Sequence, residues 1–127
     1  MDKLLGCIII EDEPLAILHL KFLIKRINRL TLLGNLDDIE EIDMIRDQLK
    51  QTKILFLDLH ISGGNIERIE HYLRHIPYII ITSALPPSEY PMFIKDRKHF
   101  VLQKPITTSK FNECLLQVLS QDIITIN

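Results

Sequence analysis

Four short apolar runs, each ending at or just before polar side chains, constrain the fold of this chain more than any other feature. Runs of this length and apolar character are typical of strands that are covered on both faces. Parallel strands share a carboxyl end, and open α/β sheets bind ligands along that edge. The polar groups after the four runs should therefore lie close together. They are Glu11 with Asp12, Asp58, Thr82 with Ser83, and Lys104.

Length and composition indicate one globular domain over residues 1–127. The chain is 46% hydrophobic and 25% charged, which is within the range of ordinary globular proteins. Its formal net charge of -2 argues against the broad basic surface that nucleic-acid binders display. The longest apolar stretches are far shorter than a membrane span. We therefore expect a cytoplasmic protein whose partners include neither nucleic acid, bound directly by this domain, nor a membrane.

Strand-like and helix-like segments alternate along the chain. The expected strands are Leu4–Ile10, Thr31–Leu36, Lys53–Leu59, Tyr78–Thr82 and Phe100–Gln103. The expected helices are Pro14–Ile27, the stretch that carries Ile39, Ile42, Ile45 and Leu49, then Ile66–His75 and Thr108–Leu119. This alternation predicts an α/β fold with a five-stranded, doubly wound parallel sheet and right-handed crossovers.

The first and fourth helical regions differ in the strength of their signal. In the first, the apolar residues Leu15, Leu18, Phe22 and Ile24 recur near helical spacing. In the fourth, three prolines between residues 86 and 91 interrupt the segment in which the alternation requires a helix. Proline removes a backbone donor and limits helical hydrogen bonding. The sequence therefore predicts a short or irregular fourth helix.

The acidic groups at the expected strand ends favour a divalent cation. Glu11 and Asp12 follow the first strand, and Asp58 lies near the end of the third, which sits beside it in this topology. Three carboxylates so close repel one another unless a cation intervenes. Oxygen ligands favour a hard ion, Mg²⁺ first. Any one of these residues alone is more often part of an acidic rim, but their joint placement with Lys104 suits a site that receives a phosphoryl group.

Two other residue pairs give no comparable signal for a metal site. Cys7 and Cys114 lack the spacing of zinc ligands, so we expect them to be buried thiols without a disulfide. His71 and His75 are four residues apart but have no third ligand nearby in the sequence. This pair indicates a solvated helix face.

Taken together, four motifs resemble the receiver domains of two-component response regulators. The segment CIIIEDEPLA at Cys7–Ala16 resembles the family's first strand and acidic pair, in a form common among receivers attached to LytTR-type DNA-binding domains. LDLHI at Leu57–Ile61 resembles the phosphoacceptor strand and its loop. IIITSA at Ile79–Ala84 resembles the strand that ends in the switch hydroxyl, and LQKPI at Leu102–Ile106 resembles the lysine strand. The resemblance covers essentially the whole chain and implies a flavodoxin-like strand order of 2-1-3-4-5.

The resemblance implies a phosphoacceptor and a set of ligands for Mg²⁺. Asp58 would accept a phosphoryl group from a sensor histidine kinase or a phosphotransfer protein. Asp12, Asp58 and the backbone carbonyl of His60 would bind the ion directly, and Glu11 would act through the ion or one of its waters. The domain would supply the nucleophile and the partner would supply the phosphoryl group, with at most slow hydrolysis of the phosphoaspartate.

The resemblance also implies which residues contact the phosphoryl group. Lys104 would pair with the phosphoryl oxygens, and its peptide bond to Pro105 would be cis, a geometry that X-Pro bonds tolerate. Thr82 would donate a hydrogen bond to one of those oxygens after phosphorylation. Ser83 could compete for this role, but neighbouring side chains on a strand point to opposite faces. Thr82 is the residue that we match to the family position.

Several positions depart from the family pattern, and they concern output rather than acceptor chemistry. Receivers usually carry tyrosine or phenylalanine three residues before the lysine, where this chain has Val101. The adjacent Phe100 should face the opposite way. Ser62 and Ile66 stand where the family often has proline and glycine. The proline-rich segment 86–91 falls on a surface through which many receivers dimerise, so the sequence leaves open whether the chain forms a homodimer.

Three functions are compatible with these observations. The first is a phosphorylated receiver that switches partner binding or a separate DNA-binding effector. The second is a pseudo-receiver, a protein-interaction module that works without phosphorylation; the complete set of acceptor residues counts against it, and Val101 leaves it open. The third is an Mg²⁺-dependent phosphohydrolase with Asp58 as nucleophile. That chemistry needs a second acid two residues further on, where His60 stands, so it ranks last.

Overall fold

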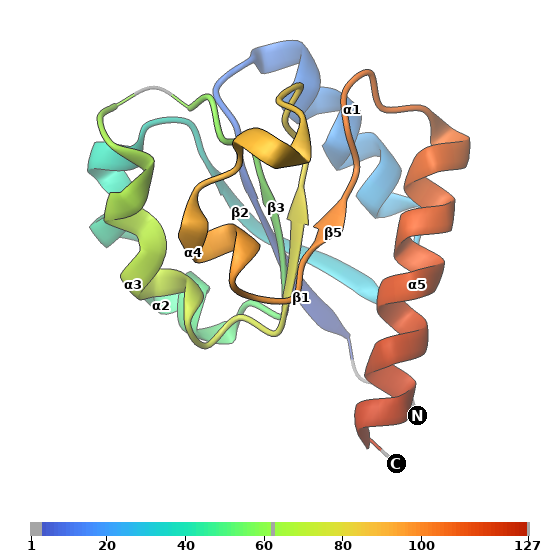
Figure 1. Cartoon of the computed structure of the whole chain (residues 1–127). Coiled ribbons are helices and arrows are strands. Elements are labelled where there is room, and N and C mark those ends of the chain that lie inside the picture. Colours follow the sequence, from blue (N-terminus) through green and yellow to red (C-terminus); the bar gives the residue numbers. More distant parts are fainter. Residues whose placement is uncertain (1–3, 62, 127) are drawn as a thin grey trace.

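Five parallel strands form one sheet in the order β2-β1-β3-β4-β5 (Figure 1). The computed structural model describes residues 4–61 and 63–126, so Ser62 lies outside the described residues. The strands are β1 (Leu5–Ile10), β2 (Leu30–Leu36), β3 (Ile54–Leu57), β4 (Tyr78–Ile81) and β5 (Phe100–Val101). The three central strands, β1, β3 and β4, are buried along their whole length. The expected fold class and strand order are confirmed.

Helices cover both faces of the sheet. They are α1 (Pro14–Lys25), α2 (Arg46–Gln51), α3 (Glu70–Leu73), α4 (Met92–Lys95) and α5 (Thr108–Ile126), with short 3₁₀ segments η1 (Ile39–Ile45), η2 (Ile66–Ile69) and η3 (Pro87–Glu89). Buried side chains of α1 and α5 pack on one face, and those of α2, α3 and α4 pack on the other (Figure 1). Alternation along β3 divides the core between the two layers: Phe56 stacks on Phe111 of α5, whereas Leu57 belongs to the opposite layer.

The second and third helical regions begin as 3₁₀ helices, which differs from the expected continuous α-helices. In η1 the apolar residues Ile39, Ile42 and Ile45 are spaced by three, and side chains three apart eclipse in a 3₁₀ helix. Ile39 and Ile42 are consequently both buried against the sheet. The Asp38 carboxylate caps this segment by accepting a hydrogen bond of 2.9 Å from the Glu40 N–H. The spacing of three therefore favours the tighter helix.

The buried face of α1 is not the one that its apolar spacing suggested. Of the four apolar residues used to identify this helix, only Ile24 is buried. Leu15, Leu18 and Phe22 are 73%, 65% and 58% exposed. The core contacts come instead from Ile24 with Leu20 and Leu23. The helix is apolar on more than one side, so spacing alone could identify the helix but not its inner face.

The remaining differences lie at element ends. The region between β4 and β5 contains only η3 and the one-turn α4, which confirms the expected irregular fourth helix. Strands β3, β4 and β5 each end earlier than the apolar runs suggested, which places the polar residues that follow them in loops. Helix α5 continues seven residues beyond its expected end at Leu119, to Ile126. The chain therefore leaves the sheet on a long final helix.

Candidate functional site

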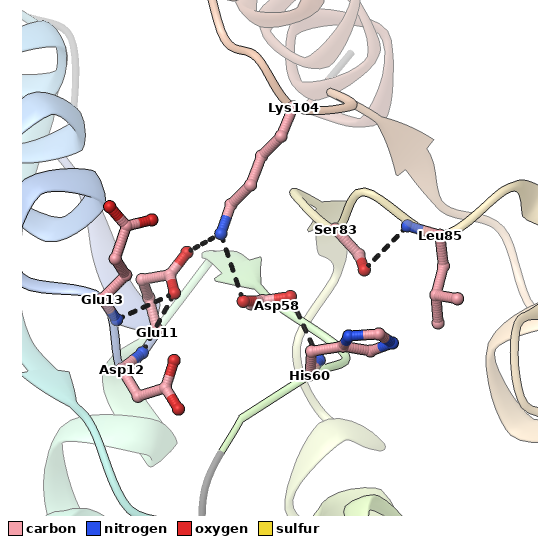
Figure 2. A network of polar contacts seen from close by, with 8 residues as sticks. All are labelled: Glu11, Asp12, Glu13, Asp58, His60, Ser83, Leu85 and Lys104. Carbon is pink, nitrogen blue, oxygen red and sulfur yellow. Dashed lines mark hydrogen bonds and ion pairs between the residues drawn. The ribbon is translucent and has the colours of Figure 1, made fainter.

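Three carboxylates meet beyond the carboxyl ends of β1 and β3 (Figure 2). Glu11, Asp12 and Asp58 each offer an oxygen within 4.8 Å of the others. The two strands are neighbours with Ile10 paired to Leu57, so Glu11 and Asp58 follow directly after paired residues. Glu11 is fully buried, Asp58 is 4% exposed and Asp12 is half-buried. The structure therefore brings together the acidic residues that the sequence placed at one edge of the sheet.

Lys104 joins this cluster from the loop that follows β5. Its Nζ lies 2.6 Å from Glu11 Oε1 and 3.2 Å from Asp58 Oδ2. The Lys104–Pro105 peptide bond is cis, as expected. Figure 2 shows the Lys104 side chain extending from its loop toward both carboxylates. One cation therefore bridges the two buried acids.

Backbone N–H groups hold the other oxygen of each buried carboxylate. Glu11 Oε2 accepts hydrogen bonds from the N–H groups of Asp12 and Glu13, at 3.0 and 3.1 Å. Asp58 Oδ1 accepts one from the His60 N–H at 3.1 Å. Each carboxylate is thus fixed by its own loop on one side and by Lys104 on the other. Lys104 and the His60 N–H therefore orient the Asp58 carboxylate from two sides.

Burial and charge act in opposite directions on the two strongest partners of this cluster. Burial raises the pKa of Glu11, and the ion pair with Lys104 and the Glu13 N–H only partly offset that effect. Burial alone would lower the pKa of Lys104, but its contacts with Glu11 and Asp58 outweigh it, so the pKa of the lysine lies above its ordinary value. Lys104 therefore stays charged at neutral pH, and ionised Glu11 remains costly.

The donor set fits Mg²⁺. All three clustered side chains are carboxylates, and oxygen ligands suit a small, hard cation that keeps several of its waters. Burial is the main cause of the raised pKa of Glu11, and the neighbouring Asp58 carboxylate adds to it even with Lys104 present. A divalent cation among these oxygens would favour the ionised carboxylates.

The two hydroxyl residues after β4 are both fully buried but differ in their contacts. The Thr82 N–H donates to the Leu57 carbonyl at 2.9 Å, which places Thr82 beside the loop that carries Asp58. Among the described residues, Thr82 Oγ1 has no hydrogen-bond partner. Ser83 Oγ accepts a hydrogen bond from the Leu85 N–H at 3.1 Å and so closes the turn after β4 (Figure 2). A buried hydroxyl without a partner is unusual in a folded protein.

Gln103 is a contributor to this edge that sequence reasoning missed. Its side-chain amide donates to the carbonyls of Ala84 and Leu85, at 3.2 and 3.3 Å. The loop that carries Lys104 is therefore tied to the loop after β4. In the sequence, only the position of Gln103 beside Lys104 hints at this role, because a glutamine that points into solvent would give the same sequence.

The position of Val101 agrees with the expected departure from the family pattern. Val101 is 42% exposed and Phe100, its neighbour on β5, is buried, so the two side chains do face opposite ways. An aromatic ring is buried elsewhere in this region: Tyr90 is 3% exposed and packs edge-on against His99.

Among the described residues, no helix is both long and apolar enough to cross a membrane.

Comparisons with known proteins give sequence relatives of one kind. No family model matches the chain. The chain is 27% identical over 112 residues to the sensory transduction protein LytT of Enterococcus faecalis, a match that covers 85% of this chain and 45% of that protein. It is 26% identical over 122 residues to LytT of Bacillus anthracis, covering 93% and 48%. The chain thus spans about half the length of the curated relatives it matches.

Several solved structures with the same fold are receiver domains. The signal receiver domain of a modulated diguanylate cyclase from Desulfovibrio desulfuricans superposes with a TM-score of 0.75 at 19% identity, covering 97% of this chain and 99% of that one. The response regulatory domain of protein mrkE from Klebsiella pneumoniae gives a TM-score of 0.74 at 22% identity, covering 92% and 97%. The chain therefore has the fold of a response regulator receiver domain, and its curated relatives are LytT-type regulators.

Proposed function

We propose that residues 1–127 form one receiver domain of a two-component signalling system and that Asp58 accepts a phosphoryl group in an Mg²⁺-dependent reaction. The observation that carries this proposal is the surroundings of Asp58. Its carboxylate is nearly fully buried at one edge of the sheet, between the Lys104 ammonium and the His60 N–H, and it belongs to a cluster of three acids. This arrangement suits a nucleophile that must be positioned and whose product must be neutralised.

The proposed reaction transfers the phosphoryl group from a histidine nitrogen of a partner to an oxygen of Asp58. The P–N bond breaks as the P–O bond forms, and the imidazole keeps the electron pair. Asp12, Asp58 and the backbone carbonyl of His60 would hold Mg²⁺, with Glu11 acting through the ion or one of its waters. When bound, the ion neutralises charge on the phosphoryl oxygens. Lys104 would exchange its contact with Asp58 for those oxygens.

Thr82 is our candidate for the hydroxyl that donates to the phosphoryl group. Its buried Oγ1 lacks a partner among the described residues and belongs to the residue that follows β4 beside Asp58. Ser83 is the second candidate, because its hydroxyl hydrogen is not used by the contact with Leu85. Thr82→Val and Ser83→Ala each remove one candidate hydroxyl. The variant without the hydroxyl that contacts the phosphoryl group should hydrolyse its phosphoaspartate at a changed rate, and the other should behave as wild type.

Exposed apolar side chains on α1 support a protein partner as phosphoryl donor. Leu15, Leu18 and Phe22 are all more than half exposed. Leu15 also lines a hollow of about 510 Å³ together with Lys104 and Pro105. A partner seated on α1 would therefore reach the edge that carries Asp58. We propose that this partner is a sensor histidine kinase or a phosphotransfer protein, and that phosphorylation then alters further partner binding, a homodimer or a DNA-binding effector included.

The direct test is the intact mass of the protein after incubation with acetyl phosphate and Mg²⁺. Wild type should gain one phosphoryl group, and Asp58→Asn should gain none while keeping its fold. Lys104→Ala should lose much of the labelling or of the response to it, although it should still bind Mg²⁺, because it keeps all three carboxylates. Labelling of Asp58→Asn equal to that of wild type would place the acceptor elsewhere.

A pseudo-receiver is the alternative that one observation favours. The position three residues before Lys104 is the exposed Val101, and α4 is a single turn. The usual aromatic switch therefore has no counterpart at that position. Failure of both acetyl phosphate and partner kinases to label the folded, Mg²⁺-binding protein would support a phosphorylation-independent interaction module.

A further inference from the structure

A cleft between α2 and α3 is lined by basic side chains. Its volume is about 560 Å³, and its walls are formed by Arg46, Leu49, Lys50, His71, Tyr72 and His75. No carboxylate is among these lining residues. Helix α2 leads into β3 and α3 leads into β4 (Figure 1). The residues that line the cleft therefore lie near the amino ends of those strands. The cleft is therefore at the opposite edge of the sheet from Asp58, and the proposed phosphoryl transfer does not use it.

Two of the residues that line the cleft, Leu49 and Tyr72, are apolar or aromatic and pack against the core. Leu49 is 4% exposed and belongs to the core layer beneath α2. Tyr72 is half-buried against the same layer, and the His71 ring packs edge-on against it with centroids 5.3 Å apart. A flat ring of a ligand could stack on such a surface, an interaction that tolerates many ring types.

The charge of the cleft exceeds what helix ends alone require. A cation near a helix C-terminus gains about 0.3–1 kcal/mol from the helix dipole, which would explain Lys50 but not Arg46 at the start of α2. Here two cations, Arg46 and Lys50, and two imidazoles, His71 and His75, line one cleft in a chain whose net charge is -2 with histidines counted as neutral. Arg46 pairs with Asp43 only at 3.5 Å, with both side chains more than half exposed. Such a pair is weak, so the guanidinium can turn toward an anion.

We propose that this cleft binds a nucleoside monophosphate. The base would lie on Tyr72 and Leu49, and the phosphate would be contacted by Arg46, Lys50 and His75. Arginine presents a planar fork that matches phosphate oxygens, and lysine adds a compact positive charge. The volume of about 560 Å³ is within the range of small-molecule sites. The ligand would report on a nucleotide pool at a site separate from phosphorylation.

The test is an NMR titration of the ¹⁵N-labelled protein with AMP, GMP, CMP and UMP. At least one nucleotide should shift the amide signals of α2 and α3, with an affinity about tenfold or more above that of adenosine or inorganic phosphate, because each of these supplies only half of the contacts. Arg46→Gln and Lys50→Gln alter exposed side chains and should each weaken binding several-fold. Lys25→Gln is the matched control, because it removes the same charge from an exposed position on α1.

Four results would overturn the proposal. The first would be that none of the four nucleotides shifts these signals at millimolar concentration. The second would be that inorganic phosphate binds as tightly as the nucleotides, which would indicate a non-specific anion effect. The third would be that Lys25→Gln weakens binding as much as Lys50→Gln does. The fourth would be that a hexaglutamate peptide shifts the same signals with equal or higher affinity, which would indicate that the cleft binds an acidic protein segment.

Discussion

Glu11 is the residue at which burial and charge conflict most. Its carboxylate is fully buried, accepts two backbone hydrogen bonds and forms an ion pair of 2.6 Å with Lys104, yet burial still raises its pKa. A buried carboxylate that remains costly despite three partners indicates that the site tolerates an unfavourable charge in order to present its oxygens. Binding of a cation there would relieve the cost.

This conflict predicts a pH dependence that Glu11→Gln removes. Because the folded state raises the pKa of Glu11 above its ordinary 4.5, the contribution of this group to stability is full below pH 4.5 and is lost as pH rises through the folded pKa. Glutamine has no proton to lose. The unfolding free energy of Glu11→Gln, measured in urea without Mg²⁺, should therefore gain on wild type from pH 4.5 toward neutral. A difference that stays constant, or moves the other way, would contradict the raised pKa.

At this scale, the sequence predicted which residues would meet but not how they contact one another. Parallel strand ends predict that Asp58 lies near Glu11 and Asp12, because strand order and strand ends fix backbone positions. The backbone hydrogen bonds to Glu11 and the ties made by Gln103 depend on loop conformation, for which the sequence carries no comparable pattern. The choice between Thr82 and Ser83 likewise depends on where β4 ends.

At the scale of elements, spacing predicted the existence of the helices better than their type or orientation. Apolar residues three apart in η1 suit a 3₁₀ helix, whereas an α-helical face mixes spacings of three and four. In α1, apolar side chains lie on both the core side and the solvent side. Only the packing of the sheet decides which of these faces is inside.

The inner face of α1 can be tested with one matched pair of substitutions. Leu20 is fully buried, so Leu20→Ala should cost about 2–5 kcal/mol of unfolding free energy through lost contacts and a cavity. Leu18 is 65% exposed, so Leu18→Ala should change stability by less than about 0.5 kcal/mol. Urea denaturation of both variants measures the difference. Equal costs would show that both faces of the helix are buried.

Two glycines in the loop after β3 provide a second test at this scale. Gly63 and Gly64 have φ of +97° and +109°, so alanine at either position should cost about 1–2 kcal/mol of backbone strain. A Cβ on Gly63 would also overlap the Asp38 carboxylate and lie 2.8 Å from the Ile39 nitrogen, whereas a Cβ on Gly64 meets nothing within 4 Å. Gly63→Ala should therefore destabilise the fold more than Gly64→Ala in urea denaturation. The reverse order would show that this loop does not pack on the cap of η1.

At the scale of the whole molecule, the sheet separates two polar regions. The acid cluster lies at the carboxyl ends of β1 and β3, and the basic cleft lies near the amino ends of β3 and β4. The alternation of strands and helices was enough to predict the sheet and the acidic edge. The cleft was not predictable, because it depends on how two short helices pack beside each other. Its histidines, His71 and His75, are exposed, as the sequence indicated.

Mg²⁺ should stabilise the whole fold through the acidic edge. A ligand that binds only the folded state raises the free energy of unfolding as its concentration increases. The melting temperature of wild type should therefore rise with Mg²⁺, and Asp12→Asn, which removes a half-buried carboxylate of the cluster, should reduce the rise. Asp43→Asn is the control, because that exposed acid lies outside the cluster. Equal responses of all three proteins would contradict a specific site.

The most direct test of the central claim is to locate the acyl phosphate by chemical reduction. Borohydride cleaves the acyl–oxygen bond of an aspartyl phosphate and leaves homoserine, which peptide mass spectrometry can assign to one position. After treatment with acetyl phosphate and Mg²⁺, the account predicts homoserine in place of Asp58 in wild type and no homoserine in Asp58→Asn. Homoserine at another carboxylate, with Asp58 unmodified, would contradict the account.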